Sequence, residues 1–312
     1  MRTLEIVHHT RYEYSHPVTL GEYRLMFRPR DSHDLRLLHT ALAIEPTAAV
    51  RWIHDPFGNS IAIASFEGET QVLELTSTIK LEHFALPLEL PPIEEYARTL
   101  PFSYLAEEAP DLARYVERHY PDPNVMVSSW TKQFPEGEGG AETFVALTRM
   151  CKGIQDGLKY SMRFELGTQP PAVTLETGTG TCRDYALLMI EGARALGLAG
   201  RFVTGYLYDP ALDGDDASPA YPHAWAEVYL PGAGWVEFDP TNGIVGTERL
   251  IRVAVGRDPE QAMPIKGTFT GAADVIVTGT VDVQVRGLGK QPPAANEAAA
   301  ATPAASTGAL TL

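Results

Sequence analysis

Hydrophobic and polar residues alternate along most of the first 85 residues, and this period of two is typical of strands. Clear runs of alternation occur at 23–28 and 72–79, and a turn at 55–59 precedes another. Short alternating runs separated by Gly, Pro, Asn and Asp are characteristic of sandwiches and small barrels. We therefore predict a β-sandwich-like domain over residues 1–85.

A proline-rich stretch at 86–92 interrupts this pattern. Proline lacks a backbone N–H and fixes φ, so the stretch cannot form a regular helix or a central strand. We interpret residues 86–110 as an interdomain linker. At the other end, residues 289–312 are mostly Ala, Thr, Pro and Ser. They have no hydrophobic period that would offset the entropy of ordering, so we predict a disordered tail.

Between the linker and the tail, helical and strand patterns are mixed. A helix is predicted at 142–158, where apolar residues recur at spacings of three and four, and a shorter one at 111–119. We expect residues 111–288 to form one catalytic core of α+β class. Its strands are predicted at 201–208, 223–230 and 235–239, with a further strand or hairpin at 274–286.

One short segment joins glycines, a cysteine and a helix. Gly-Thr-Gly-Thr at 178–181 leads directly to Cys182, and the apolar residues that follow have helical spacing up to Gly197. A thiol in the first turn of a helix lies beside free backbone N–H groups and the positive end of the helix dipole. Both favour the thiolate, which is the nucleophilic form. We predict that Cys182 is a nucleophile whose own N–H is an oxyanion donor.

The second cysteine, Cys151, falls within the apolar stripe of the predicted 142–158 helix. A buried cysteine usually behaves as a small hydrophobic residue, so we interpret Cys151 as structural. A disulfide with Cys182 is not expected in a cytoplasmic chain. The sequence has no Cys-x-x-Cys motif, and we predict neither a zinc site nor any other cofactor.

A histidine and an aspartate stand at the same end of a predicted hairpin. His223 begins its first strand and Asp239 ends its second, with a Pro-Gly-Ala-Gly turn at 231–234 between them. A carboxylate fixes the tautomer of an imidazole, which suits His223 as base and Asp239 as its partner. Simple pairing leaves Asp239 a few residues short of directly opposite His223, so a bulge or a diagonal contact is needed. Cys182, His223 and Asp239 together indicate a catalytic triad.

Several motifs follow one another through this core: Gly-Thr-Cys-Arg-Asp-Tyr at 180–185, His-Ala-Trp-Ala-Glu-Val at 223–228 and Gly-Trp-Val-Glu-Phe-Asp-Pro-Thr-Asn at 234–242. Together they resemble the bacterial transglutaminase-like family, and Asp-Pro-Phe-Gly-Asn at 55–59 resembles part of its N-terminal domain. The resemblance implies a papain-like core in which the nucleophile helix packs on an antiparallel sheet. It also implies the triad Cys182, His223 and Asp239.

Three further residues are weaker candidates. The family often has a tyrosine where Tyr160 stands, and Tyr160 either helps to stabilise an oxyanion or simply packs. Trp225 is a candidate wall of a substrate channel, although aromatic strand residues more often pack. Asp184 is best explained as a cap of the first turn of the nucleophile helix.

Charge and hydropathy narrow the range of partners. The net charge is −15, which disfavours binding to nucleic acid or to anionic lipid. No apolar run approaches the ~20 residues that a membrane span requires. The first residues, Met1 to His9, read as a strand rather than a secretory signal. We expect a cytoplasmic enzyme that acts on a protein or peptide; the sequence does not indicate its oligomeric state.

The predicted chemistry is cysteine-dependent acyl transfer through a thioester on Cys182. Water would resolve the thioester in a peptidase or amidase, and an amine would resolve it in a transglutaminase. Both reactions need the same triad, and the resemblance to bacterial members favours hydrolysis. The alternative from another class is a non-catalytic scaffold on the same fold, although an intact set of Cys, His and Asp argues against it.

Overall fold

The computed structural model describes residues 2–84, 92–135, 141–161, 167–208, 218–247 and 249–288. The predicted tail and residues 86–91 of the predicted linker lie outside these ranges. The helices of the described ranges are α1 (Ala109–Val116), α2 (Met126–Thr131), α3 (Thr143–Gly157), α4 (Pro171–Thr177), α5 (Cys182–Ala195), η1 (Glu95–Ala97), η2 (Pro123–Val125) and η3 (Pro259–Ala262). The strands are β1 (Arg2–Leu20), β2 (Tyr23–Arg28), β3 (Leu35–Glu45), β4 (Ala49–His54), β5 (Ser60–Ser65), β6 (Glu69–His83), β7 (Thr99–Leu100), β8 (Ala141–Glu142), β9 (Lys159–Tyr160), β10 (Thr179–Gly180), β11 (Gly200–Leu207), β12 (Ser218–Leu230), β13 (Gly234–Asp239), β14 (Ile244–Val245), β15 (Leu250–Gly256), β16 (Ile265–Lys266), β17 (Phe269–Thr270) and β18 (Val277–Gly287).

The N-terminal region contains two sheets, as its alternating pattern indicates. In the larger sheet β6 lies between β1 and β3, and in the smaller sheet the order is β16-β2-β5-β4. Side chains of both sheets share one buried cluster, which includes Leu25 of β2, Ala62 of β5 and Leu75 of β6. The sheet-rich character is therefore confirmed. A separate β-sandwich-like domain over residues 1–85 stays a prediction, because the larger sheet continues through β18 into β12 and β13 of the helical half, the part of the chain that contains α1 to α5.

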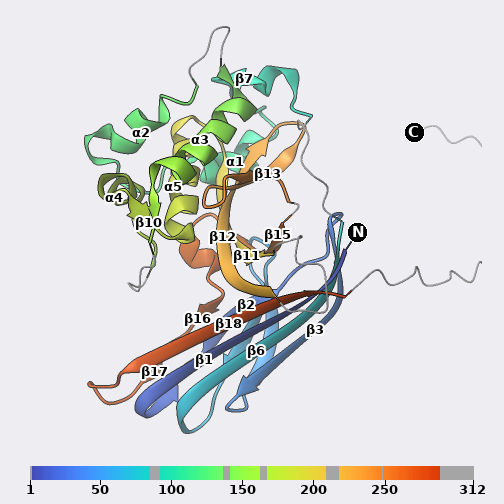
Figure 1. Cartoon of the computed structure of the whole chain (residues 1–312), viewed down its shortest axis with the longest axis vertical. Coiled ribbons are helices and arrows are strands. Elements are labelled where there is room, and N and C mark those ends of the chain that lie inside the picture. Colours follow the sequence, from blue (N-terminus) through green and yellow to red (C-terminus); the bar gives the residue numbers. More distant parts are fainter. Residues whose placement is uncertain are drawn as a thin grey trace, which may run out of the picture.

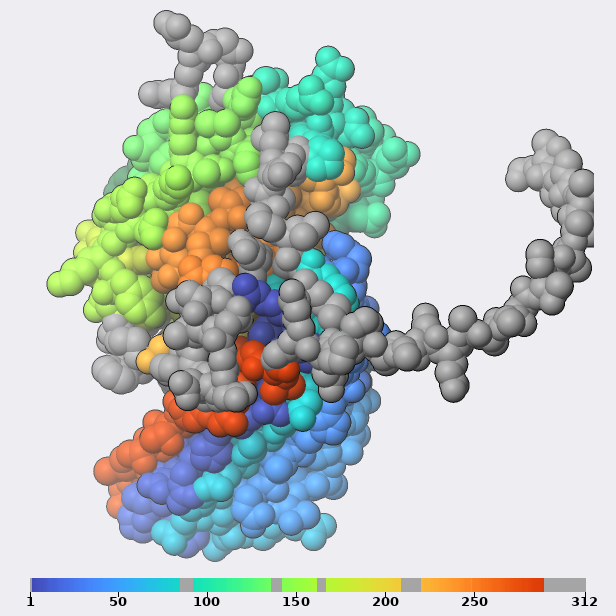
Figure 2. Space-filling model, turned by 45° about the vertical axis from the view of Figure 1, so that its right-hand side comes forward, coloured from blue at the N-terminus to red at the C-terminus, as the bar shows by residue number. Residues whose placement is uncertain are grey.

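The C-terminal strand β18 lies beside the N-terminal strand β1, while the predicted domain division stays a prediction. We assigned it to the catalytic core, but it pairs antiparallel with β1 from Leu4↔Gly287 to Tyr14↔Val277. Figure 2 shows the red C-terminal strand beside the blue N-terminal one. Sequence alternation reveals that a segment is a strand but carries no information on which distant strand it joins.

The described part of the predicted linker, residues 92–110, is also ordered structure. Ile93 and Ala97 are buried in the core of the helical half. Thr99 and Leu100 form β7, which pairs with β8. These described residues pack on the helical half, whereas residues 86–91 of the predicted linker lie outside the described residues.

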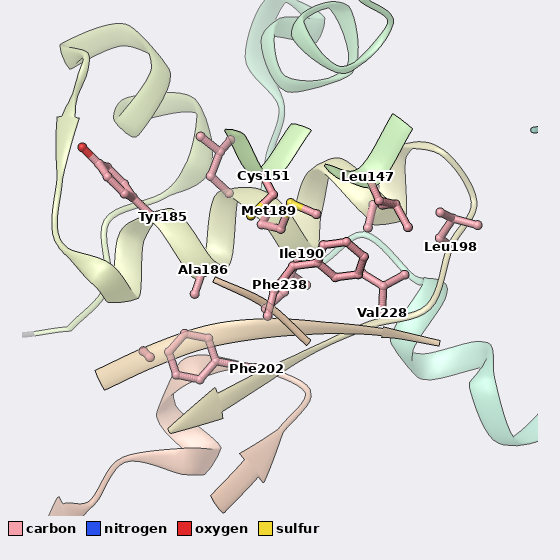
Figure 3. Close-up of a cluster of buried hydrophobic side chains, with 14 of the residues drawn as sticks. Leu147, Cys151, Tyr185, Ala186, Met189, Ile190, Leu198, Phe202, Val228 and Phe238 are labelled. Atoms are coloured by element: carbon pink, nitrogen blue, oxygen red, sulfur yellow. The ribbon is translucent and has the colours of Figure 1, made fainter. Parts of the chain in front are cut away.

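The helical half packs helix α5 on the antiparallel strands β11, β12 and β13 (Figure 1). In Figure 3, Ala186, Met189 and Ile190 of α5 face Phe202, Val228 and Phe238 of the sheet, and α3 contributes Leu147 and Cys151. The fold class, mixed α and β with a helix on a sheet, is as predicted. Predicted helix 142–158 is α3, and predicted helix 111–119 is α1, which ends at Val116.

Buried charges fix the far end of α5. Glu191, which is fully buried, accepts from Arg194 Nη1 at 2.8 Å and from Arg118 Nε at 2.7 Å. Arg194 also donates to the backbone oxygens of Gly200 and Arg257. Breaking one partner of such a network leaves an uncompensated buried charge, which typically costs about 3–5 kcal/mol. The helix that begins at Cys182 therefore has a rigidly held support.

Strand β12 joins the two halves. Its first residues, from Ser218↔Val285 to Ala220↔Val283, pair with β18 of the N-terminal sheet. The rest of the strand pairs with β11 and β13 of the sheet on which α5 packs. His223 lies three residues beyond the last pair with β18, so the strand that carries it is anchored in both halves.

Candidate active site

Cys182 is the first residue of α5, as predicted. Thr181 is the N-cap, and its backbone N–H and hydroxyl donate to Asp184 Oδ2 at 2.8 and 2.9 Å. Asp184 also accepts from the Gln169 backbone N–H at 2.7 Å. This capping box confirms Asp184 as a structural cap and fixes the turn that presents Cys182. The Cys182 side chain is partly buried.

His223 and Asp239 are in direct contact. His223 Nε2 lies 2.9 Å from Asp239 Oδ2, and both side chains are buried. The contact is diagonal, because Ala226 pairs with Phe238 and Asp239 is the next residue beyond that pair. With Nε2 bound to the carboxylate, Nδ1 is the ring nitrogen available to the thiol, and the Cys182 side chain is the second hydrogen-bond partner of His223.

These contacts determine the charge of His223. Burial alone would lower its pKa, but hydrogen bonds with Asp239 and Cys182 raise the pKa to about 10. The imidazole is therefore protonated at neutral pH. An imidazolium between a carboxylate and a sulfur atom stabilises a thiolate and can deliver a proton to a leaving group.

Asn242 is a site residue that the sequence analysis missed. Its Nδ2 donates to Asp239 Oδ2 at 2.7 Å and lies 3.5 Å from His223 Nε2. The backbone N–H groups of Thr241 and Asn242 donate to Asp239 Oδ1 at 3.0 and 3.3 Å. An aspartate that accepts from the next backbone N–H groups is a known type of turn, so the Asp-Pro-Thr-Asn sequence contained a usable signal. The turn orients the carboxylate towards His223.

Tyr160 is brought to the site by a short parallel pairing, in which β9 lies beside β10 with Gly180↔Tyr160. Its hydroxyl lies close enough to the backbone and side chain of Cys182 for both to influence the pKa of Tyr160. Burial, and then the charge of Cys182, raises the pKa of Tyr160. Tyr160 is 48% exposed, so it lies at the solvent side of the thiol, and its role at an oxyanion stays a prediction.

Trp225 does not occupy the predicted position. It is fully buried and packs with Val203, Leu250 and Val255, so it cannot wall an open substrate channel. Its ring is stacked against the imidazole of His223, with centroids 6.0 Å apart. Strand parity placed Trp225 on the same face as His223 but could not show that this face is covered there.

Gly205 forms part of the same support. It lies opposite His223 in the β11–β12 pair and opposite Arg252 in the β11–β15 pair. A Cβ atom at this position would lie 2.0 Å from Ile251 O and 2.8 Å from the Trp225 ring. Only glycine permits this approach, and the sequence analysis gave Gly205 no role.

The remaining thiol differs from Cys182 as predicted. Cys151 is fully buried in α3, and its Sγ lies 3.8 Å from the backbone oxygen of Ile244. Burial raises the pKa of this thiol strongly. Within the described ranges, no group of three or more His, Cys, Asp or Glu residues is placed to hold a metal ion. No helix of the same ranges is both long and apolar enough to cross a membrane.

Comparison with known proteins gives consistent results. Residues 4–82 match the bacterial transglutaminase-like N-terminal region, and residues 128–240 match the transglutaminase-like superfamily. The chain is 26% identical to protein ML0607 of Mycobacterium leprae, over 89% of this chain and 98% of that one. It is also 26% identical to Rv2569c of Mycobacterium tuberculosis, over 89% and 91% of the two chains. Both relatives are named as uncharacterized.

Among solved structures, the chain is similar to a Cytophaga hutchinsonii protein whose name assigns it provisionally to the cysteine proteases. The TM-score is 0.72 at 17% identity, and the match covers 93% of this chain and 92% of that one. At this identity the likeness establishes a shared fold over nearly the whole length of both chains.

Proposed function

We propose, on the premise that this chain belongs to the transglutaminase-like superfamily, that it is a cysteine-dependent acyl-transfer enzyme that hydrolyses peptide or amide bonds. The observation that carries the proposal is the position of His223. It contacts Asp239 on one side and Cys182 on the other, and Cys182 begins α5. Nucleophile, proton carrier and orienting carboxylate thus form one connected set.

In the first half of the proposed reaction, the Cys182 thiolate attacks the carbonyl carbon of an amide and a C–S bond forms. The carbonyl electron pair moves to oxygen, and N–H groups at the start of α5 and the Tyr160 hydroxyl donate hydrogen bonds to it in this proposal. When the carbonyl re-forms, the C–N bond breaks and protonated His223 delivers its proton to the leaving nitrogen. The product is a thioester on Cys182 and a free amine or ammonia.

In the second half, neutral His223 takes a proton from water as the water oxygen attacks the thioester carbon. The C–S bond breaks, the acid leaves, and the thiolate and imidazolium are restored. The exposure of Tyr160 beside the thiol supports water as the acceptor, because water reaches this side of the site. The burial of Trp225 supports it too, since this side chain does not shield the thioester from solvent.

The test is mass spectrometry of a mixed peptide pool incubated with the protein and a primary amine. Cys182→Ala is the inactive control, and Cys151→Ala is the matched control that removes the other thiol. Cleaved or deamidated peptides that require Cys182 but not Cys151 would support hydrolysis. Amine adducts on glutamine would show that the reaction is transamidation and not hydrolysis. Covalent changes that are equal in wild type and Cys182→Ala would overturn the assignment of the nucleophile.

A protein that changes no peptide is tested in a second way. A carbonyl electrophile with an amide-like leaving group is added, and acylation of the intact chain is followed by mass. Acylation that is confined to Cys182 and abolished by His223→Gln would support the proposal that the protein is an enzyme. The absence of acylation at Cys182 would favour a scaffold on the same fold.

A further inference from the structure

The N-terminal region contains a cavity that the proposed chemistry does not use. The cavity has a volume of about 330 Å³ and lies between β2 and β4 of the smaller sheet and β3 and β6 of the larger one. Figure 1 shows β2, β3 and β6 in the lower half of the molecule, away from the start of α5. The volume falls in the range of roughly 300–1,000 Å³ that is usual for small-molecule sites.

The walls of the cavity are apolar, and its rim is open to solvent. Leu25 and Phe27, both buried, line it from the smaller sheet, and Leu42 lines it from the larger one. Val50 and Trp52 of β4 also line it and are 42% and 49% exposed. An aromatic ring that is half in solvent beside an apolar floor loses contact with water when a ligand fills the space.

Two polar groups of the lining have unused hydrogen-bonding capacity. Ser77 is 3% exposed, and its hydroxyl makes no hydrogen bond with any described residue. The Ser77 hydroxyl is not among the buried polar atoms that lack a partner, so it is accessible from the cavity and can donate to a ligand there. Ser77 lies opposite Leu42 in the β3–β6 pair, which places it among the residues that form the cavity.

The guanidinium of Arg28 supplies a positive charge at the cavity. Its guanidinium donates to the hydroxyl of Thr40, which also lines the cavity, and among the described residues it forms no ion pair with a carboxylate. In contrast, Arg51 on β4, the next strand but one in the same sheet, is paired with Glu22. A guanidinium beside an apolar cavity, with no carboxylate of its own, attracts an anion, and its planar donors match the two oxygens of a carboxylate.

We propose that this cavity binds a small apolar carboxylate, such as an aryl- or branched-chain alkanoate. The apolar body lies against Leu25, Phe27 and Trp52. The carboxylate lies at Arg28 and Thr40, with Ser77 as a further donor. The site binds its ligand non-covalently, through complementary charge and shape. It is distinct from the site at Cys182.

The test is calorimetric titration of the whole protein with phenylpropionate, because this probe joins one aromatic ring to one carboxylate. A probe of this size is expected to bind with a Kd in the millimolar range or tighter. Arg28→Gln should weaken binding about tenfold to a hundredfold, the usual effect of losing a charge-assisted hydrogen bond. Ser77→Ala should weaken it a few-fold. Arg28 is exposed, so its replacement leaves the fold intact.

Matched controls separate this site from others. Arg51→Gln removes a neighbouring arginine outside the lining, and Cys182→Ala alters the candidate active site; both should bind as the wild type does. The amide of the same acid should bind at least tenfold more weakly, because it carries no charge. Unchanged affinity in Arg28→Gln, equal affinity for acid and amide, or no binding up to the solubility of the probe would each overturn the proposal.

Discussion

Replacing Gly205 by alanine tests how tightly the sheet is closed beside His223. The new Cβ atom would lie 2.0 Å from Ile251 O, and an ordinary contact begins at 3.4 Å. The carbonyl must therefore retreat by about 1.4 Å. Such a shift strains the pairing of Gly205 with Arg252. Overpacking costs about 1–3 kcal/mol, and a weakened backbone hydrogen bond adds about 1 kcal/mol.

We therefore expect Gly205→Ala to lower the free energy of unfolding by about 2–4 kcal/mol. The measurement is urea unfolding followed by tryptophan fluorescence, with the slope against urea unchanged. Gly157→Ala is the matched control, because a Cβ at the end of α3 meets nothing within 4 Å. It should be neutral or should stabilise the protein by up to about 1 kcal/mol. A loss below about 0.5 kcal/mol in Gly205→Ala would refute the argument, because surface substitutions alone reach that size.

Three further predictions concern the site. At pH 6, iodoacetamide should alkylate Cys182 and leave Cys151 unmodified until urea unfolds the chain, as peptide mass mapping will show; equal labelling of both would contradict the assigned environments. The pKa of His223 is raised to about 10 from about 6.5 when unfolded, so its stabilisation is complete below pH 6.5 and is lost as the pH rises through 10. Wild type should have a higher free energy of unfolding than His223→Gln at pH 6, and this difference should shrink by a few kcal/mol between pH 6 and 10, by roughly 1.4 kcal/mol per pKa unit. A difference in urea unfolding that stays constant with pH would contradict the raised pKa of His223. Asn242→Ala should shift the pH profile of Cys182 alkylation because Asp239 loses a donor at 2.7 Å; a change in stability with an unmoved profile would reduce Asn242 to a structural residue.

The local parts of the fold could be predicted from the sequence. Helix α3 was expected at 142–158 and covers Thr143–Gly157, and the helix after Cys182 begins at that residue. Both follow from a hydrophobic period and end signals within one segment. His223 and Asp239 could be placed at one end of a hairpin for the same reason, since a short turn fixes which strands pair.

The parts that the sequence did not reveal depend on residues far apart in the chain. The pairing of β18 with β1 joins the two ends of the described chain, and no local pattern encodes that choice. The burial of Trp225 results from β11 and β15, which cover it. The close approach at Gly205 likewise needs three neighbouring strands. In each case the determining contact is tertiary, whereas a sequence pattern describes only one segment of the chain.

The pairing of β1 with β18 has a consequence for the synthesis of the protein on the ribosome. The second edge of β1 stays without β18 until residues 277–287 have been synthesised, roughly 200 residues after β6 is complete. At about 5–20 residues per second, this interval lasts about 10–40 s. During it the nascent chain displays an open strand edge that can pair with another chain. The same interval delays the pairing of the first residues of β12 with β18.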